Sequence, residues 1–218
     1  MGAKGAWAKF PTRWILQRKL NLISWRAYKS DGTAALLVLI ALAVKRNRDQ
    51  VERVPEGDAS MVKATYDEIQ DLIGISRAKV AHGLDLLARL RIIERVEDKR
   101  SYYRIIGLNE PGRWAKLPQE LMMDQPGRIS AFDPFTLRSK SEFDALKLYL
   151  LMVAFRNTRT GFAHIGYEKI SEYTGVGTRY LRKAKSHLIS LGLIHVDLDY
   201  ENAMEQSKPP LRYKVLGL

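Results

Sequence analysis

Hydrophobic and polar positions follow the same order twice along this chain. An apolar run at 34–44 precedes apolar residues spaced every three or four positions across 66–90, and two short apolar runs follow at 92–96 and 102–106. Spacing of three to four residues indicates amphipathic helices, and two short runs on either side of a turn indicate a hairpin. The second series occupies 145–156, 167–191, 193–198 and 211–216. The pattern therefore predicts helices followed by a β-hairpin, twice.

Residue identities support an internal repeat, a feature that decides the fold class when it is present. GAWAKFP (5–11) matches GRWAKLP (112–118) at an offset of 107 (112 − 5). Three further segments align in the same order, at offsets of 110, 101 and 110: 35–47 with 145–157, 66–93 with 167–194, and 103–108 with 213–218. We therefore expect two domains, 1–108 and 109–218, with Trp7 and Trp114 each packed against the core of its own domain.

Each unit is expected to begin with an extended Lys-x-Pro segment and to end with a hairpin. Gly74 and Gly175 suit a tight turn between helices, since glycine adopts left-handed conformations without a steric penalty. Ser76 suits the N-cap of the helix that follows. The predicted elements are the buried helices 33–46 and 142–156, the short helices 66–73 and 167–174, the longer helices 77–90 and 179–191, and the hairpin strands 92–96 with 102–106 and 193–198 with 211–216.

The longer helix of each unit carries one apolar face. In the first unit this face consists of Val80, Leu84, Leu87 and Leu90, and Leu181, Leu188 and Leu191 repeat it in the second. Lys185 stands where Leu84 predicts a buried residue. Its amine must therefore reach the edge of the core, or this helix is rotated slightly.

A helix, a helix-turn-helix and a β-hairpin together resemble a winged helix-turn-helix domain. The resemblance is carried by Ile-Gly-Ile-Ser-Arg-x-x-Val at 73–80 and by Thr-Gly-Val-Gly-Thr-Arg at 174–179, each followed by spaced leucines. It implies a mainly α fold with small β-hairpins (α+β), built as two winged-helix domains in tandem from an internal duplication.

The Lys-x-Pro segments add a second resemblance. Lys9-Phe10-Pro11 and Lys116-Leu117-Pro118 each precede apolar residues and a helix. This order resembles the N-terminal winged-helix domains of plasmid and phage replication initiators. Transcription regulators share every other element, so both functions remain open at this point.

The composition indicates which class of partner and which cellular compartment to expect. The 218 residues carry a formal charge of +12 with a pI near 9.9, which favours a polyanionic partner and nucleic acid first. The absence of cysteine excludes disulfides, a thiol nucleophile and cysteine-ligated zinc. The apolar run 34–44 is shorter than the roughly 20 residues that span a bilayer. We expect a cytoplasmic protein without a membrane partner.

The resemblance implies which side chains would contact DNA, because the second helix of a helix-turn-helix lies in the major groove. The hairpin tip would reach phosphate or the minor groove. The alternatives are an ordinary solvated basic helix face and a charged turn. In the first unit the expected contacts are Arg77, Lys79, His82, Arg89, Lys99 and Arg100, and in the second they are Arg179, Tyr180, Arg182, Lys183 and Ser186.

Two further segments differ between the units. The first 30 residues contain seven basic and no acidic residues, with interleaved aromatics that either track a nucleic-acid backbone or staple the core. The second hairpin is long and acidic, which should keep it away from phosphate. Its acidic residues are Asp197, Asp199, Glu201 and Glu205.

Catalytic patterns are absent from the sequence. The four histidines show no metal spacing, Gly175-Val176-Gly177 lacks the context of a dinucleotide fingerprint, and no Walker sequence occurs. We expect no enzyme activity, no metal and no cofactor.

The leading hypothesis is a sequence-specific double-stranded DNA-binding protein, a plasmid or mobile-element replication initiator that binds repeated origin sites. The alternatives are a transcriptional repressor and a tandem winged-helix scaffold subunit of a chromosome-organising complex. A second copy of the chain and replication proteins are further candidate partners.

Overall fold

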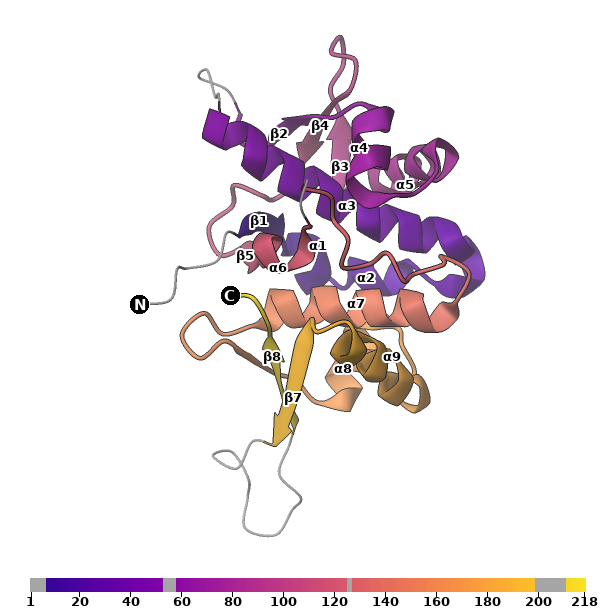
Figure 1. Cartoon of the computed structure of the whole chain (residues 1–218), viewed down its shortest axis with the longest axis vertical. Coiled ribbons are helices and arrows are strands. Elements are labelled where there is room, and N and C mark those ends of the chain that lie inside the picture. The colour runs from indigo at the N-terminus through magenta and orange to yellow at the C-terminus, as the bar shows by residue number, and fades with distance from the viewer. Residues whose placement is uncertain (1–6, 53–57, 125–126, 199–210) are drawn as a thin grey trace.

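The structure, a computed structural model, combines helices with small antiparallel sheets (Figure 1). It describes residues 7–52, 58–124, 127–198 and 211–218. The first part of the chain forms β1 (Ala8–Pro11), α1 (Arg13–Leu16), α2 (Lys19–Leu22), α3 (Trp25–Glu52), β2 (Met61–Lys63), α4 (Tyr66–Ile73), α5 (Arg77–Arg89), β3 (Ile93–Arg95) and β4 (Tyr102–Ile105). The second part forms β5 (Trp114–Leu117), α6 (Gln119–Met122), α7 (Lys140–Phe155), β6 (Phe162–His164), α8 (Tyr167–Thr174), α9 (Thr178–Ser190), β7 (Ile194–Leu198) and β8 (Leu211–Val215).

The predicted helix pairs are confirmed. Helices α4 and α8 have the predicted bounds, and α5 and α9 differ from the prediction by one residue at their ends. Gly74 and Gly175 end α4 and α8 with φ values of 67° and 69°, in the left-handed region that glycine tolerates. The Ser76 side chain caps α5 by accepting a hydrogen bond from the amide of Lys79 at 3.4 Å.

The long helix of the first part begins earlier than predicted. Helix α3 starts at Trp25 instead of position 33, and Lys29 interrupts its helical geometry with φ 47° and ψ −131°. The polar residues before the apolar run give no helical period, but Trp25 and Tyr28 pack against the core and hold this segment in place. Between Trp25 and Arg48 the helix is long and apolar enough to span a membrane by length and composition, yet 72% of its most apolar window is buried inside the protein.

Each three-stranded sheet contains a strand that the sequence pattern missed. Strands β2 and β6 complete three-stranded antiparallel sheets in the orders β2-β4-β3 and β6-β8-β7. Both are three residues long, which is too short for an alternating pattern to be recognised.

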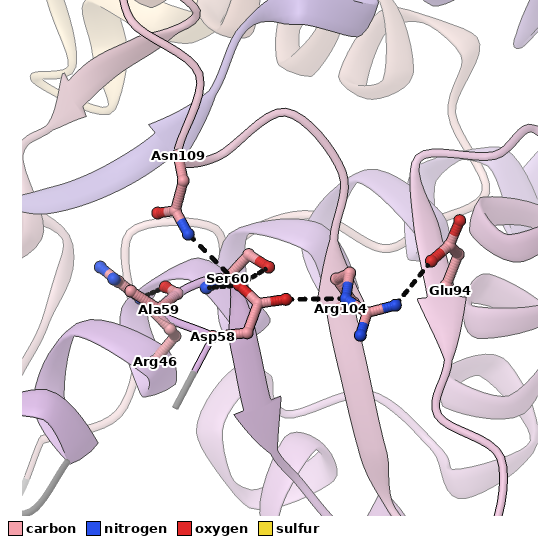
Figure 2. A network of polar contacts seen from close by, with 7 residues as sticks. All are labelled: Arg46, Asp58, Ala59, Ser60, Glu94, Arg104 and Asn109. Carbon is pink, nitrogen blue, oxygen red and sulfur yellow. Dashed lines mark hydrogen bonds and ion pairs between the residues drawn. The ribbon is translucent and has the colours of Figure 1, made fainter. Parts of the chain in front are cut away.

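Polar contacts tie the start of β2 to the rest of the first sheet (Figure 2). Asp58 accepts hydrogen bonds from the Ser60 hydroxyl at 2.6 Å and from Arg104 Nε at 2.8 Å, and Arg104 also donates to Glu94 at 3.1 Å. The bonds from Ser60, followed by that from Arg104, lower the pKa of Asp58. Arg104 of β4 thus holds the segment that leads into β2, and Glu94 of β3 in turn holds Arg104.

The two copies of the Trp-Ala-Lys-x-Pro segment pair with each other. Strands β1 and β5 form a two-stranded antiparallel sheet in which Lys9 lies opposite Lys116. The rings of Trp7 and Trp114 stack at 5.7 Å, and Trp114 is 36% exposed. The expectation that each tryptophan packs against its own unit was therefore wrong. Pairing two similar strands satisfies their backbone groups, and it places the rings on one another outside the core.

A single hydrophobic core includes residues from both halves of the chain. Helices α3 and α7 pack on one another across the middle of the molecule, with α5 against α3 and α9 against α7 (Figure 1). Lys147 of α7 is 2% exposed, and its amine donates to the carbonyl of Ile23 at 2.7 Å. The division at residues 108 and 109 stays a prediction, because the two halves share this core.

Candidate nucleic-acid interface

Helix α9 presents a basic face to solvent. Its buried side is apolar and consists of Leu181, Ala184 and Leu188. The other side exposes all five residues predicted as contacts in this unit, namely Arg179, Tyr180, Arg182, Lys183 and Ser186. Lys185 lies between the two sides, and its amine donates to the Tyr167 hydroxyl at 2.6 Å, which confirms that it extends to the edge of the core.

Two cations of this face have no partner in the part of the chain that the structure describes. Among the residues that the structure describes, the side chains of Arg182 and Lys183 make no hydrogen bond or ion pair. Arg179 lies over the ring of Tyr180 at 4.6 Å, and Lys140 of α7 lies over the same ring at 4.2 Å. A solvated cation does not have to give up a protein partner before it binds a phosphate or a base edge. The side chains of this face are therefore available to an anionic ligand.

Helix α5 differs, because several of its predicted contacts bind the protein itself. The amine of Lys79 lies 2.6 Å from a carboxylate oxygen of Asp31 in α3, and the His82 ring lies 3.3 Å from the same oxygen. Arg89 lies over the ring of Tyr28 at 5.4 Å. Partial burial alone raises the pKa of Asp31, but the bonds from Lys79 and His82 lower it overall.

The remaining predicted contacts of the first unit come together in a groove. Arg77 at the start of α5, together with Lys99 and Arg100 at the tip of the β3–β4 hairpin, lines a groove of about 930 Å³. Arg77 pairs with Asp67 and lies over the ring of Tyr66. The groove also contains residues that sequence reasoning did not single out: Lys63, Arg95 and Tyr102.

Charge in this groove is unbalanced. Five cationic side chains and two carboxylates, those of Asp67 and Asp98, line it, and Arg95 also pairs with Asp85 of α5. Lys63 and Lys99 lie over the ring of Tyr102 at 5.9 and 5.8 Å. The amides at the start of α4 are already capped, since Thr65 and Glu68 form a reciprocal capping box. The cationic side chains, and not the helix terminus, are therefore the groups of this groove that could hold an anion.

The basic N-terminal segment is folded from residue 7 onward, and two of its arginines form ion pairs within the protein. Arg13 pairs with Glu110, and Arg18 lies 2.7 Å from Glu172 of α8. Trp14 is buried and donates to the Pro11 carbonyl. The sequence left two roles open for the aromatic residues of this segment, contact with a nucleic-acid backbone or packing in the core. In the structure they pack in or against the core, except Trp7, which stacks on Trp114.

The second hairpin is described only near its base. Asp197 of β7 pairs with Arg212 of β8 at 2.9 Å, and this hydrogen bond lowers the pKa of Asp197. The other predicted acidic positions, Asp199, Glu201 and Glu205, lie outside the described residues. Within the described ranges, no group of three or more histidine, aspartate or glutamate side chains could hold a metal ion.

Comparisons with protein-family models, with curated proteins and with solved structures find no match to this chain.

Proposed function

We propose that this chain is a sequence-specific double-stranded DNA-binding protein with two winged helix-turn-helix units and no catalytic activity. The observation that carries the proposal is the solvent-exposed basic face of α9. Arg179, Arg182 and Lys183 project from the second helix of a helix pair, the position from which a helix reads the major groove. An arginine can donate two hydrogen bonds to guanine, and a lysine amine can neutralise a phosphate.

The groove beside α5 supports the same ligand. A duplex offers a continuous row of phosphates, one charge per roughly 1.7 Å of its axis. Arg77 supplies a cation to one groove from a helix start, and Lys99 and Arg100 supply cations to the same groove from a hairpin tip. The formal charge of +12 would attract the same polyanion over longer distances.

Within this class we propose replication initiation on a plasmid or another mobile element, through repeated origin sites in the cytoplasm. The doubled Lys-x-Pro segment favours this process over transcriptional repression, since it is the feature that resembles initiators. A genetic assay separates the two processes. An initiator gene supports replication of a linked origin, whereas a repressor gene only silences a promoter. Replication proteins and a second copy of the chain would be its protein partners.

The direct test of DNA binding is selection from a random duplex pool, followed by a salt titration of the enriched sequence. We expect one preferred sequence and an affinity that falls by about 10³-fold or more between 50 and 200 mM salt, because several phosphate contacts release counterions. Enrichment without a preferred sequence would contradict specificity. An affinity that does not change with salt would support the scaffold alternative instead.

A further inference from the structure

The groove beside the start of α5 concentrates positive charge in one concave place. Its five cations come from four elements: Lys63 from β2, Arg77 from α5, Arg95 from β3, and Lys99 and Arg100 from the tip of the β3–β4 hairpin. Its volume of about 930 Å³ lies within the range of roughly 300–1,000 Å³ that is usual for sites of small ligands. The groove therefore has both the size and the charge to take a small anion.

Three of these cations are not neutralised by the part of the protein that the structure describes. Lys63 and Lys99 lie over the ring of Tyr102, and neither their side chains nor that of Arg100 forms a hydrogen bond or an ion pair. The other two cations of the groove pair with carboxylates. Like charges held close together repel one another, and a multivalent anion bound between them would remove that repulsion.

The tyrosines of the groove favour an anion over an aromatic base. Burial raises the pKa of Tyr103 to about 12, so its hydroxyl stays protonated and can donate to an anionic oxygen. The rings of Tyr66 and Tyr102 already have cations of the groove over them. We therefore expect recognition to depend on the charged groups of the ligand more than on stacking.

The cations of the groove are not a general feature of the repeated fold. Strand register and the offset of 101 identify the equivalent positions of the second unit, since Arg95 lies opposite Tyr103 just as Val196 lies opposite Tyr213. Three of the five cations are replaced there. The replacements are His164 for Lys63, Thr178 for Arg77 and Val196 for Arg95.

The tyrosines, in contrast, are repeated, and in the second unit they contact a lysine of their own unit. The equivalents of two groove tyrosines are Tyr167 and Tyr213. The amine of Lys185, which stands at the position of Leu84, donates to the Tyr167 hydroxyl at 2.6 Å and lies 6.0 Å from the centre of the Tyr213 ring. The tyrosines thus belong to the shared fold, and the set of cations serves a task of the first unit that the second does not share.

We propose that this groove is the binding site of a small ligand with a chain of two or three phosphates, and that this ligand and DNA occupy the first unit alternately. The second part of the proposal rests on the proposed DNA-binding function. A phosphate chain carries several negative charges on one narrow ligand that can enter a concave groove, whereas the phosphates of a duplex lie on a convex rod. Inorganic triphosphate and a nucleoside triphosphate both supply this chemistry.

The site is tested without DNA, by isothermal titration calorimetry of the full-length chain at about 0.15 M salt. The ligands are inorganic triphosphate, ATP and citrate, and Mg²⁺ is left out because it would neutralise the phosphate chain. We expect triphosphate to bind at one site per chain, and citrate to bind about tenfold more weakly or less, because its carboxylates are spread over a branched carbon frame. Absence of triphosphate binding, or equal affinity for citrate, would overturn the site.

The ATP titration identifies the source of the phosphate chain. Affinities of ATP and triphosphate within about tenfold of each other would show that the phosphate chain alone is recognised. A larger advantage of ATP would identify a nucleotide as the ligand, and a larger advantage of triphosphate would identify the free chain. All three results support a site for a phosphate chain.

A pair of matched variants locates the site. Lys63→Gln/Arg100→Gln removes two exposed cations of the groove and should weaken triphosphate binding about tenfold or more, since charge-assisted hydrogen bonds are lost. Lys169→Gln/Arg159→Gln removes the same charge from exposed positions of the second half and should bind triphosphate as the unmodified chain does. Equal losses from the two variants would overturn the assignment to the groove.

The alternation with DNA is tested by mobility shifts of the selected duplex, with triphosphate or with sodium chloride at equal ionic strength. We expect triphosphate to weaken DNA binding by the unmodified chain and to have no such effect on Lys63→Gln/Arg100→Gln. Unchanged DNA affinity of the unmodified chain would overturn the alternation while calorimetry upholds the site. If the random pool yields no bound duplex, the proposed function fails, and calorimetry still decides whether the groove binds a phosphate chain.

Discussion

At the scale of single residues, similar cations have different roles because the fold supplies a partner to some of them and none to others. Lys79 is half-buried and neutralised by Asp31, whereas Lys183 is exposed and without a partner among the described residues. A cation already bound to a carboxylate must give up that partner before it meets a phosphate. The basic residues of α9 are therefore expected to dominate affinity.

The Arg179→Ala/Lys183→Ala variant is expected to bind the selected duplex roughly ten- to a hundredfold more weakly, with a smaller salt dependence, because base and phosphate contacts are lost together. Its unfolding free energy should change little, since both side chains are exposed. Electrophoretic mobility shifts and urea denaturation measure the two quantities. Arg113→Ala/Arg159→Ala removes the same charge from exposed positions outside α9 and should weaken binding much less. Equal losses from both variants would point to general charge attraction.

Buried Lys147 is expected to make the unfolding free energy depend on pH. Burial lowers its pKa to about 7 from 10.5, an effect that neighbouring Asp144 partly opposes. Between these values the unfolded chain binds more protons than the folded one, so the unfolding free energy should rise with pH by up to about 1.4 kcal/mol per unit. We expect this rise between pH 7 and about 9.5 in urea denaturation.

Lys147→Met tests the origin of that slope, since it keeps the stem and removes the titrating amine. The carbonyl of Ile23 loses its donor, so the variant need not be more stable. Its unfolding free energy should be nearly flat over the same pH interval. A slope that persists unchanged in Lys147→Met would assign the pH dependence to another group.

At the scale of elements, the turn between α8 and α9 does more than connect two helices. Gly175 has a φ of 69°, and Asn21 from the other half occupies the space where a side chain would begin. Gly192 follows α9 with a φ of 66° and has nothing within 4 Å of the same position. The two glycines share a backbone conformation and differ in contact.

Gly192→Ala should destabilise the protein by about 1–2 kcal/mol, the cost of a left-handed conformation for an L-residue. Gly175→Ala carries the same cost and must also displace Asn21, so its loss of unfolding free energy should be larger. Urea denaturation of the two variants gives the difference. Equal losses would show that the contact between Asn21 and this turn contributes nothing.

At the scale of the whole molecule, the shared core predicts cooperative unfolding of the two halves. Leu148 of α7 is fully buried, and α7 packs on α3. Leu148→Ala should cost about 2–5 kcal/mol. Hydrogen exchange should show reduced protection by the same amount in α5 as in α9, because both helices rest on the same pair of central helices. A loss of protection confined to the second half would mean that the halves unfold independently.

The sequence alone determined the elements that depend on local order. Helical spacing located α4, α5, α8 and α9, and two glycines at equivalent positions marked their turns, because periodicity and left-handed turns are properties of neighbouring residues. The repeat itself was also visible. Of the candidate site, the sequence identified the basic face of α9 and the three groove residues Arg77, Lys99 and Arg100.

Only the tertiary structure decided which partners those elements meet. The two Trp-Ala-Lys-x-Pro segments pair with one another, since a repeated strand can pack on its own unit or on its copy and nothing local distinguishes the two. Asp31 binds Lys79 and His82 because α3 begins early and thereby brings Asp31 next to α5. No helical periodicity in the sequence predicts this early start. The placement of Asn21 at Gly175 and of Arg128 at Gly74 is likewise a relation between distant segments.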